Sequence, residues 1–598
     1  PYAWWQGKTR VLPEPEPYTA SYDVAGVPQA TREQVLKHLQ SWTGFSDIRK
    51  EHNLAKDLGI DSLSKVELFV WLEEEFGTTQ VDTDAIQTVS DVMLAASGEG
   101  ASATRLELKP VRQVWYRTKT YGKCVEGCAG RAVSGAFLQQ AARDPGAAVV
   151  ADPYRGVMTY RDIILGILLV KRFIEKEEGE NIGVMFPASA VAPILYLASL
   201  FCGKTPVMFN WTVGRRAFRH NVAATGVRTI VTSRIMLETL DRQGIDLRGC
   251  GAQFVNLEDV VAGLRRRTKL WCWLKSRLAC GELRHCDPPV NAVILFTSGS
   301  EAMPKAVPLT HGNLLTNIRD ITTVISLAEE ERLTGILPPF HSFGLLGTVL
   351  LPLLVRMPTV YYPVPTDGAA IADIIAHFRT TALIGTPSFL NTIVRMAGHD
   401  QLASLRLVVT GAEKCTQDTY DRITRACPDL TLLEGYGITE CSPVVAVNPR
   451  TAPKRFSVGK VLPSLRYALV SPETRTAVET GESGRLLVRG DSVCHGYYAD
   501  SGPSPFVTYD GCEWYDTGDI LAEDPDGYLF FKGRVKRFVK MGGEMISLPA
   551  IESVLRPHLE QEGDDTPPFA VTANEVENGY PEIVLFTIRD IDRETANR

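Results

Sequence analysis

One loop of the sequence has a composition suited to binding phosphate. The segment LFTSGSEAMPKAVPLTH runs from Leu295 to His311, and a predicted strand, AVILF, leads into it. Small hydroxyl residues and a glycine allow backbone N–H groups to surround a phosphate chain, and a lysine adds a positive charge. The spacing differs from the Walker pattern, so a polar turn after a strand is the alternative. The candidate phosphate ligands are Thr297, Ser298, Gly299, Ser300 and Lys305.

Further motifs follow the phosphate loop in a particular order. PPFHSFGL begins at Pro338 and GAEK at Gly411; LLEGYGITECSP, WYDTGDI and GRVKRFVKMGGEMIS come after them. Each motif taken alone has a structural explanation, because Glu440 could cap a helix and Asp519 could stabilise its own tight turn. The order of the motifs is much more specific than any one of them.

Taken in this order, the motifs resemble the adenylate-forming superfamily of acyl-CoA synthetases, luciferases and peptide-synthetase adenylation domains. The similarity runs from about Arg131 to the end of the chain. TSGSE, PPFHSFGL and GAEK are similar to the acyl-acyl-carrier-protein synthetase part of the bifunctional 2-acylglycerophosphoethanolamine acyltransferase/acyl-ACP synthetases. The resemblance implies an AMP-forming acid–thiol ligase, in which a fatty carboxylate attacks the α-phosphate of ATP and a thiol then captures the acyl group from the adenylate. Catalysis would depend on positioning and on positive charge held around the α-phosphate.

The resemblance also implies a role for each catalytic residue. Thr297 to Lys305 would bind the β- and γ-phosphates, Thr439 would approach the α-phosphate, and Glu440 would hold the Mg²⁺ ion. His341 would shape the pocket for the carboxylate; the alternative is a packed, hydrogen-bonded histidine.

The remaining ATP and AMP contacts implied by the resemblance involve the ribose and the adenine. Asp519 would accept hydrogen bonds from the ribose hydroxyls, with Arg534 assisting. The adenine slot and its borders would comprise Gly411, Ala412, Glu413, Glu434, Gly435, Tyr436 and Gly437.

The end of the chain departs from the pattern of the superfamily. Lys536 matches the hinge on which a small C-terminal domain rotates, and Gly542 and Gly543 match the tunnel for the pantetheine thiol, although a hairpin turn explains the two glycines equally. The superfamily has a lysine in a GK motif near its C terminus, and the sequence reaches Arg598 without one. We expect truncation, and therefore a chain that binds ATP but adenylates poorly; rapid ATP–pyrophosphate exchange would contradict this.

A short acidic segment near the N terminus resembles an acyl carrier protein. Residues 27–100 contain 13 acidic and 6 basic side chains, which accounts for the whole net charge of −7. GIDSLSKVELFVWLEEEFG begins at Gly59 with apolar residues spaced by three and four, and predicted helices at Thr31–Trp42 and Val89–Ala96 complete a bundle. The resemblance makes Ser62, in the DSL triplet, the attachment point for 4′-phosphopantetheine. A plain helix cap at Asp61 and Ser62 is the alternative.

Composition excludes several classes of protein. The 598 residues are 44% hydrophobic and 22% charged, which is ordinary for a globular chain, and 63 basic against 70 acidic side chains argue against a nucleic-acid partner. Twelve scattered cysteines favour a reduced, cytoplasmic setting, with the inner face of a membrane as a second location. No signal-peptide pattern precedes the motifs, and because the chain begins with Pro1 we expect an upstream portion, where any acyltransferase half would lie.

Three other features have competing interpretations. The uncharged runs Ile182–Gly203 and Leu333–Val355 are long enough to cross a bilayer, but their prolines favour a strand followed by a buried helix. The segment Leu264–His285 has seven Lys and Arg among tryptophans and leucines. It could lie on an anionic membrane, receive the acidic carrier helix, or be a solvated surface helix. Cys280, His285 and Cys286 lack a suitably spaced fourth metal ligand, so we expect no metal besides Mg²⁺.

The expected fold is α/β: a large adenylate-forming domain and a small, truncated α+β C-terminal domain, preceded by an all-α carrier-like bundle. We expect an arm at residues 1–26, the bundle at 27–100, and at 101–131 a linker that includes the first elements of the next domain. The large domain would span 132–533 and the small domain 534–598. The predicted function is acyl-carrier-protein acylation with a fatty acid, using ATP, Mg²⁺ and 4′-phosphopantetheine and feeding phospholipid acylation. The alternatives are an acyl-CoA ligase and a catalytically reduced binding scaffold.

Overall fold

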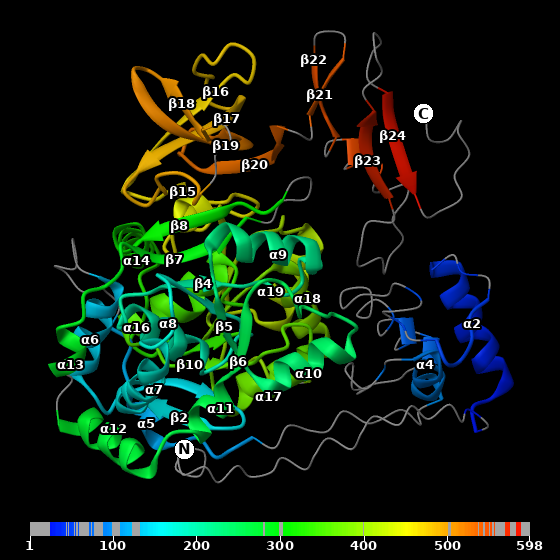
Figure 1. Cartoon of the computed structure of the whole chain (residues 1–598). Helices are drawn as coiled ribbons and strands as arrows, with labels where there is room; N and C mark the ends of the chain where they lie inside the picture. Colours follow the sequence, from blue (N-terminus) through cyan, green and yellow to red (C-terminus); the bar gives the residue numbers. More distant parts are fainter. Residues whose placement is uncertain are drawn as a thin grey trace.

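A computed structural model gives the fold of the chain (Figure 1). It describes residues 24, 26–43, 45, 47–52, 54, 58, 68, 71–72, 75–76, 86, 88–97, 108–121, 132–278, 281–297, 303–398, 400–499, 504–535, 538–541, 544–548, 551–552, 555, 569–574 and 582–587. Predicted site residues Ser62, Ser298, Gly299, Ser300, Lys536, Gly542 and Gly543 lie outside this set.

The N-terminal module is helical, as predicted. It contains α2 (Gln29–Thr43) and α4 (Val89–Ala96), drawn in blue in Figure 1. Thr88 and Asp91 form a capping box at the start of α4, which satisfies two of its free N–H groups. A core of aliphatic side chains, including the fully buried Leu39 and Leu72, joins the helices to the segment that follows Gly59.

Residues 108–121 are packed on the large domain. This stretch contains α5 (Gln113–Arg117), whose Trp115 is fully buried and donates its indole N–H to the Phe378 carbonyl at 2.9 Å. The Thr118 hydroxyl accepts from the Ala148 backbone N–H at 2.9 Å. These contacts attach residues 108–121 to the large domain; the predicted boundaries of the linker at 101 and 131 stay a prediction.

The large domain contains a nine-stranded sheet in the order β15-β14-β13-β12-β11-β9-β10-β1-β2. The six strands from β13 to β1 are parallel, and the strands at both margins are antiparallel. The strands are β1 (Ala148–Asp152), β2 (Gly156–Thr159), β9 (Leu333–Gly335), β10 (Thr359–Tyr361), β11 (Ala382–Gly385), β12 (Leu407–Thr410), β13 (Thr431–Gly437), β14 (Val444–Val447) and β15 (Lys460–Val461).

A second sheet has six strands in the order β6-β5-β3-β4-β7-β8, of which β8 alone is antiparallel to its neighbour among these described strands. Its strands are β3 (Asn181–Val184), β4 (Thr205–Met208), β5 (Thr229–Thr232), β6 (Gln253–Asn256), β7 (Asn291–Phe296) and β8 (Ala306–Thr310). The apolar runs NIGVMF, RTIVT, AVILF, TALIG and LRLVVTG all contain strands of these two sheets, which confirms the predicted parallel α/β pattern.

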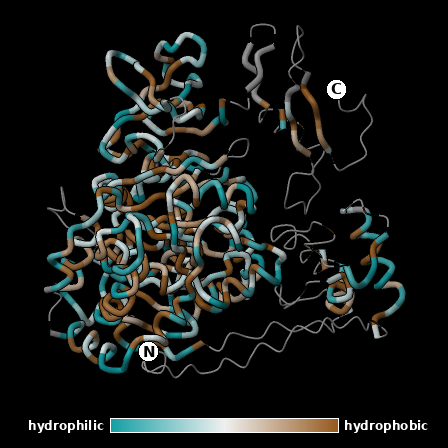
Figure 2. The backbone as a smooth tube through the Cα atoms, in the orientation of Figure 1, coloured by the Kyte–Doolittle hydropathy of each residue, from teal (hydrophilic) through white to brown (hydrophobic). Residues whose placement is uncertain are grey.

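Helices cover both sheets and fill the space between them. Helix α8 contacts β3 and β4 on one side and η1 on the other, and η1 contacts β9, so the main core lies between the sheets. Figure 2 shows this interior largely in brown. The helices are α6 (Val133–Arg143), α7 (Tyr160–Ile174), α8 (Ala192–Leu200), α9 (Gly214–Thr225), α10 (Arg234–Arg242), α11 (Leu257–Ala262), α12 (Arg266–Leu278), α13 (Gly281–Arg284), α14 (His311–Ile325), α15 (Ser342–Gly344), η1 (Leu345–Leu350), α16 (Leu351–Val355), α17 (Gly368–Phe378), α18 (Pro387–Met396), α19 (Gln417–Ala426) and η2 (Thr439–Cys441).

Antiparallel strands complete the described chain and are drawn above the large domain in Figure 1. A five-stranded sheet is formed by β16 (Leu465–Val470), β17 (Ser483–Gly490), β18 (Phe506–Tyr509), β19 (Cys512–Glu523) and β20 (Leu529–Arg534). Two hairpins follow, made of β21 (Phe538–Met541) with β22 (Glu544–Ser547), and β23 (Phe569–Asn574) with β24 (Glu582–Thr587).

The two long uncharged runs are buried parts of the large domain. The first contains β3 and α8, and the second contains β9, α15, η1 and α16, as predicted from their prolines. Among the described residues, no helix has both the length and the apolar composition that crossing a bilayer requires.

Candidate active site

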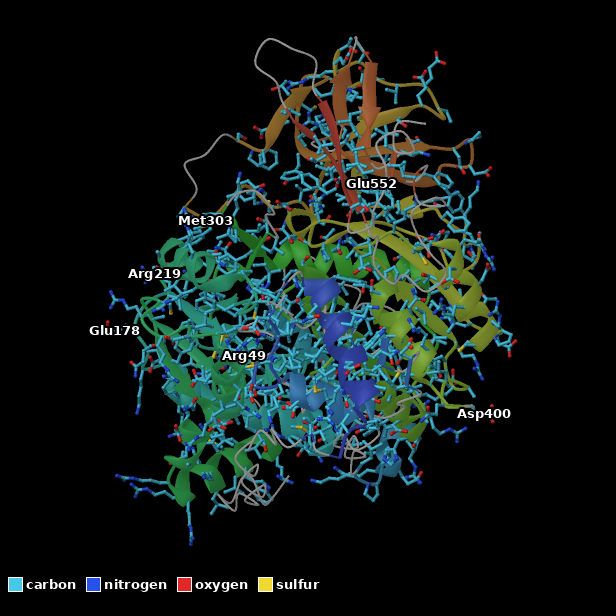
Figure 3. The ribbon with its side chains drawn as sticks, turned by 90° about the vertical axis from the view of Figure 1, so that its right-hand side faces the viewer. Arg49, Glu178, Arg219, Met303, Asp400 and Glu552 are labelled. Atoms are coloured by element: carbon cyan, nitrogen blue, oxygen red, sulfur yellow. The ribbon has the colours of Figure 1, made fainter. Side chains whose placement is uncertain are left out.

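The base of the phosphate loop is closed by two hydrogen bonds. Strand β7 ends at Phe296, and the next residue, Thr297, donates its backbone N–H to the Lys305 carbonyl at 3.0 Å. The Lys305 backbone N–H donates in turn to the Thr297 hydroxyl at 3.1 Å. Because β8 begins at the next residue and pairs antiparallel with β7, the loop is held at the end of a hairpin. Met303, labelled in Figure 3, marks the end of this loop near the strands drawn above the large domain.

The side chains of Lys305 and Glu440 both contact the same tyrosine, Tyr497. The Lys305 ammonium is 4.3 Å from the centre of the Tyr497 ring, within the range of a cation–π contact. The Tyr497 hydroxyl donates to Glu440 Oε1 at 3.0 Å and lies 3.2 Å from the Tyr515 hydroxyl. Tyr497 therefore connects the phosphate-loop lysine to the predicted magnesium ligand.

Glu440 is held in η2 at the end of β13. Its residue is 7% exposed, so its carboxylate is largely removed from water. Thr439 precedes it, and the Thr439 hydroxyl lies 3.3 Å from that of Ser342. The structure thus brings Thr439 and Glu440 together with the segment that follows β9.

His341 lies in that segment, directly before α15. Its ring is 4.6 Å from the ring of Phe340, which is packed edge-on against Trp211. The His341 side chain reaches solvent, yet the protein around it desolvates the imidazole and lowers its pKa. A lowered pKa favours the neutral imidazole, which suits the predicted role of bordering a carboxylate without adding a fixed charge.

Asp519 is placed differently from the sequence-based expectation. It lies within the long strand β19, next to a register shift, and not in a tight turn. Gly518, which precedes it, has a φ of 70°, a conformation that favours glycine. The WYDTGDI motif has the Gly and Asp typical of a turn, but continued pairing with β20 extends the strand through it.

The Asp519 carboxylate is buried and has two partners. Asp519 Oδ2 accepts from the Tyr436 hydroxyl at 2.5 Å, and Oδ1 lies 3.3 Å from Arg534 Nε, directly across from it on β20. Burial raises the pKa of Asp519 in spite of these partners. Burial, reinforced by the neighbouring carboxylate, also raises the pKa of Tyr436 well above its usual value.

The predicted adenine slot is assembled from the ends of β12 and β13. A Cβ placed on Gly411 would come within 3.0 Å of the Gly435 carbonyl and 3.8 Å of the Phe343 ring, so these three residues are neighbours. Ala412 has a φ of 70°, which turns the chain sharply after Gly411. The Thr410 hydroxyl, at the same edge, is buried without a hydrogen-bond partner in the structure, which is unusual and suits a polar ligand at this place.

Two carboxylates predicted to bind the nucleotide already accept hydrogen bonds from other groups of the protein. Glu434 Oε1 accepts from the Tyr420 hydroxyl at 2.5 Å and from the Phe456 backbone N–H at 2.9 Å. Glu413 accepts from the hydroxyl and backbone N–H of Ser388 at the start of α18. The Glu434 carbonyl also accepts from the backbone N–H and the side-chain amide of Asn448. Contact of Glu434 or Glu413 with a nucleotide stays a prediction.

Sequence reasoning missed the tyrosines and small residues that hold the predicted ligands in place. Tyr497, Tyr420 and Thr410 belong to none of the motifs quoted above, and Ser342 lies in PPFHSFGL without having been singled out. HGYYAD, which contains Tyr497, follows the strand β17, and an aromatic pair at the end of a strand next to a phosphate site was the available signal. Among the described residues, no cluster of three or more His, Cys, Asp or Glu side chains forms a metal site, and Cys280 lies outside them.

Comparison with known proteins assigns these elements to two families. Residues 137–498 match the AMP-binding enzyme family, and residues 33–93 match the phosphopantetheine attachment site family. A feruloyl-CoA synthase of Amycolatopsis sp is 30% identical over 382 residues, which cover 60% of this chain and 70% of that protein. A long-chain-fatty-acid–CoA ligase of Salmonella typhimurium is 26% identical over 410 residues, covering 64% of this chain and 72% of that protein.

Solved structures confirm the fold. ATP-bound MatB from Rhodopseudomonas palustris superposes with a TM-score of 0.64 at 22% identity, covering 77% of this chain and 91% of that one. The anthranilate CoA ligase AuaEII with anthranoyl-AMP gives 0.62 at 20% identity, covering 78% and 89%. The chain therefore belongs to the AMP-binding enzyme family, has the adenylate-forming fold with a large and a small domain, and carries a helical phosphopantetheine attachment domain ahead of them.

Proposed function

We propose that the chain activates a fatty carboxylate with ATP and transfers the acyl group to the thiol of 4′-phosphopantetheine attached at Ser62. The observation that carries this proposal is the presence, in one chain, of a phosphopantetheine attachment domain at 33–93 and an AMP-binding region at 137–498. A carrier fused to an activating enzyme supplies its own thiol acceptor at high effective concentration. The product would be an acyl-carrier thioester available for lipid acylation.

In the first step the carboxylate oxygen attacks the α-phosphorus and pyrophosphate leaves. Thr297 and Lys305 would bind the departing phosphates. The hydrogen bonds that close the base of their loop, and the positive charge of Lys305, support this role. Thr439, whose hydroxyl lies 3.3 Å from that of Ser342, would approach the α-phosphate. His341 would border the incoming carboxylate, and Asp519 with Arg534 would bind the ribose hydroxyls.

A Mg²⁺ ion fits the donors at this site. Mg²⁺ prefers carboxylate and phosphate oxygens, and it usually takes only one or two ligands from the protein. Glu440 offers a buried carboxylate oriented by the Tyr497 hydroxyl, beside the loop that would carry the phosphates. When bound, the ion would neutralise the charge of the phosphates; Glu440 would hold it, and Lys305 would add a second positive charge.

The second step breaks the mixed anhydride. The pantetheine thiol would lose its proton and attack the acyl carbon, forming a thioester and releasing AMP. Hinge residue Lys536 and the thiol-tunnel glycines Gly542 and Gly543 remain predictions by resemblance. Met541, which directly precedes them in the sequence, pairs with Glu544 between β21 and β22.

Few residues separate the carrier module from the stretch that packs on the large domain. Residues 98–107 separate the end of the α4 segment from the packed stretch that begins at Leu108. Ten extended residues reach at most about 35 Å, whereas a free linker of about 30 residues would have allowed a much wider search. Acylation within one chain and acylation between two chains are therefore both to be tested.

Mass spectrometry of the intact protein tests the proposal. The chain, converted to the holo form by a phosphopantetheinyl transferase, is incubated with Mg-ATP and a fatty acid, and in a parallel sample with a synthetic fatty acyl adenylate. We expect a mass increase of one acyl-pantetheine unit that Ser62→Ala abolishes. ATP–pyrophosphate exchange measures the first step separately. Acylation that persists in Ser62→Ala would refute the assignment of the acceptor.

Mixing two variants separates the two routes. A Lys305→Ala chain with holo Ser62 is combined with a Ser62→Ala chain that retains the phosphate-loop lysine. Acylation of the Lys305→Ala chain demonstrates transfer between molecules. If the wild-type chain is acylated but the Lys305→Ala chain in the mixture is not, the transfer takes place within one molecule.

A second candidate is an acyl-CoA ligase that uses free CoA. It is favoured by the names of the similar proteins, several of which are CoA ligases. The same Ser62→Ala chain discriminates between the two, because formation of acyl-CoA at the wild-type rate from free CoA would favour this second function. The choice of a fatty acid as substrate is supported by the similarity to the long-chain-fatty-acid ligase.

A further inference from the structure

Helix α12 presents two large apolar side chains to solvent, while Trp273 packs partly buried against the main core. Leu270 is 59% exposed and Trp271 is 52% exposed, whereas Cys272 and Ser276 on the opposite side are buried. The Cys272 thiol lies against the Leu168 carbonyl of α7, which fixes the side of the helix that faces inward. An ordinary surface helix keeps its large apolar side chains inward, so the outward Leu270 and Trp271 are the unusual feature of α12.

Cationic side chains surround the exposed apolar pair. Arg265, Arg266 and Arg267 are exposed at the beginning of the helix, and Arg277 is exposed near its end. The Arg277 guanidinium lies 4.0 Å from the centre of the Trp273 ring. Helix α12 itself contains no acidic residue, and the neighbouring Glu282 is paired with Lys275. The exposed surface is therefore apolar at its centre and positive at both ends.

A groove of about 520 Å³ lies beside this surface. It is bordered by α6 and α13, and its lining combines the apolar side chains of Leu138, Phe201 and Leu283 with two cations, Arg143 and Arg284. Arg284 belongs to the same basic segment as α12. The apolar and cationic character of α12 thus continues onto the neighbouring elements.

We propose that α12 and the α13 margin of the groove form a docking surface for an anionic phospholipid bilayer. Tryptophan and leucine side chains enter the boundary between headgroups and acyl chains, while arginines remain at the level of the phosphates. Charge complementarity and the outward apolar pair together identify the occupant. Such a surface would hold the enzyme where fatty acids are released from lipids. That benefit rests on the proposed function, whereas the contact with lipid does not depend on it.

The position of α12 argues against the acidic carrier as its occupant. In Figure 1 α12 lies at the lower end of the large domain, whereas the strand β20 that bears Arg534 lies at the upper end. Figure 3, turned by 90°, keeps the same separation and shows nitrogen-tipped side chains projecting from the green helix at the bottom. A carrier bound to α12 would hold its thiol at the end of the domain away from Asp519 and Arg534.

Co-sedimentation of the full chain with vesicles tests the proposal. The vesicles are phosphatidylcholine alone or a mixture with phosphatidylglycerol. We expect binding to the anionic vesicles, weakened on the order of 100-fold in the triple variant Arg265→Gln, Arg266→Gln, Arg267→Gln, because each basic residue near such a surface contributes about 1 kcal/mol. The double variant Leu270→Ser, Trp271→Ser should lose about tenfold or more, since less apolar area enters the bilayer.

A matched control removes three arginines elsewhere. Arg215, Arg216 and Arg219 are exposed on α9, and Arg219 is labelled in Figure 3 well above the basic helix. Their triple change to glutamine has the same effect on net charge and should retain most of the binding. Equal losses in the α9 and α12 variants, or absence of binding to anionic vesicles, would overturn the proposal.

Cross-linking tests whether the acidic carrier module, rather than a bilayer, binds to α12. A zero-length carbodiimide cross-link between Lys269 and a carboxylate of residues 27–100, in a chain that does not bind vesicles, would also overturn the proposal. Vesicle binding that is retained in Lys305→Ala would separate this surface from the proposed enzymatic function, because that variant affects only the nucleotide site.

Discussion

The hydroxyl of Tyr497 donates a hydrogen bond to the Glu440 carboxylate at 3.0 Å, while the ring of the same tyrosine lies 4.3 Å from the Lys305 ammonium. A backbone hydrogen bond from Tyr498 to Ala306, at the start of β8, fixes this segment next to the phosphate loop. One side chain thus orients an anion with its polar end and a cation with its aromatic face. Both groups are those proposed to bind Mg-ATP.

Tyr497→Phe should weaken Mg-ATP binding about fivefold, because Glu440 loses a hydrogen bond worth roughly 1 kcal/mol while the ring beneath Lys305 remains. Tyr497→Leu also removes the cation–π contact and should cost about threefold more. Isothermal titration with and without Mg²⁺ checks this, and the Phe variant should differ from wild type only with the ion present. Tyr498→Phe is the control, because its hydroxyl bonds to Asn181 outside the site. Equal affinities for all of these chains would contradict the role of Tyr497.

Asp519→Asn should weaken ATP binding by roughly 10- to 100-fold, the effect of losing hydrogen bonds to a charged group. The sharper result concerns the sugar: wild type should bind 2′,3′-dideoxy-ATP much more weakly than ATP, whereas the variant should bind the two equally. Asp510→Asn, in an exposed turn with positive φ that asparagine tolerates, serves as the control. A variant that still discriminates between the two nucleotides would show that another residue binds the ribose.

ATP affinity should also decrease in acid through Asp519. Burial raises its pKa, so the ionised carboxylate that accepts from the ribose is lost at a higher pH than for an exposed aspartate. The sign is opposite for folding: a raised carboxyl pKa means that the ionised form destabilises the native state, and protonation relieves that cost. Titrations at a series of pH values should show the decline in wild type and its absence in Asp519→Asn. A parallel decline in both chains would assign it to a different group.

The order of the motifs located the residues of the candidate site, but not the contacts that hold them together. Thr297, Lys305, Thr439 and Glu440 lie in loops at strand ends, and apolar runs bounded by polar residues locate such ends well. Tyr497 could not be found in this way, because its partners are distant in the sequence and become neighbours only when two sheets pack. For the same reason local turn composition gave the wrong surroundings for Asp519, where pairing with β20 continues the strand.

The start of the large domain is a second feature that depends on contacts between residues distant in the sequence. The sequence from 101 to 131 has mixed composition, and nothing local distinguishes a linker from a packed segment. Trp115 makes the difference, since its ring is fully buried against Phe378 more than 250 residues later. Helix α12 is the converse case: its basic and aromatic composition indicated a surface segment, but the side that faces outward could be identified only from the contacts with α7.

Trp115→Ala should destabilise the large domain by about 3–5 kcal/mol, because it leaves a large cavity and an unpaired Phe378 carbonyl. It should also expose residues 108–121 to protease. Thermal unfolding and limited proteolysis measure the two effects. Trp271→Ala is the control, since that ring is half exposed, and it should change neither. Retained protection of residues 108–121 in Trp115→Ala would show that other contacts, such as Thr120 with Glu331, suffice to hold the segment.

His38 should make the carrier module less stable in mild acid. Its ring stacks on Trp71 with centroids 3.8 Å apart, and burial lowers its pKa to about 4 from a usual value of 6.5. Between these two values the unfolded module binds more protons than the folded one, so stability is lost as pH falls from about 6.5 towards 4. Hydrogen exchange of the α2 amides should show protection that declines over this range. In His38→Gln the decline should be absent, whereas His495→Gln, in an exposed position on the large domain, should behave like wild type. NMR titration of the imidazole decides the cause: a His38 that titrates near 6.5 in the folded protein would contradict the burial, and would assign any acid sensitivity to the carboxylates of the module.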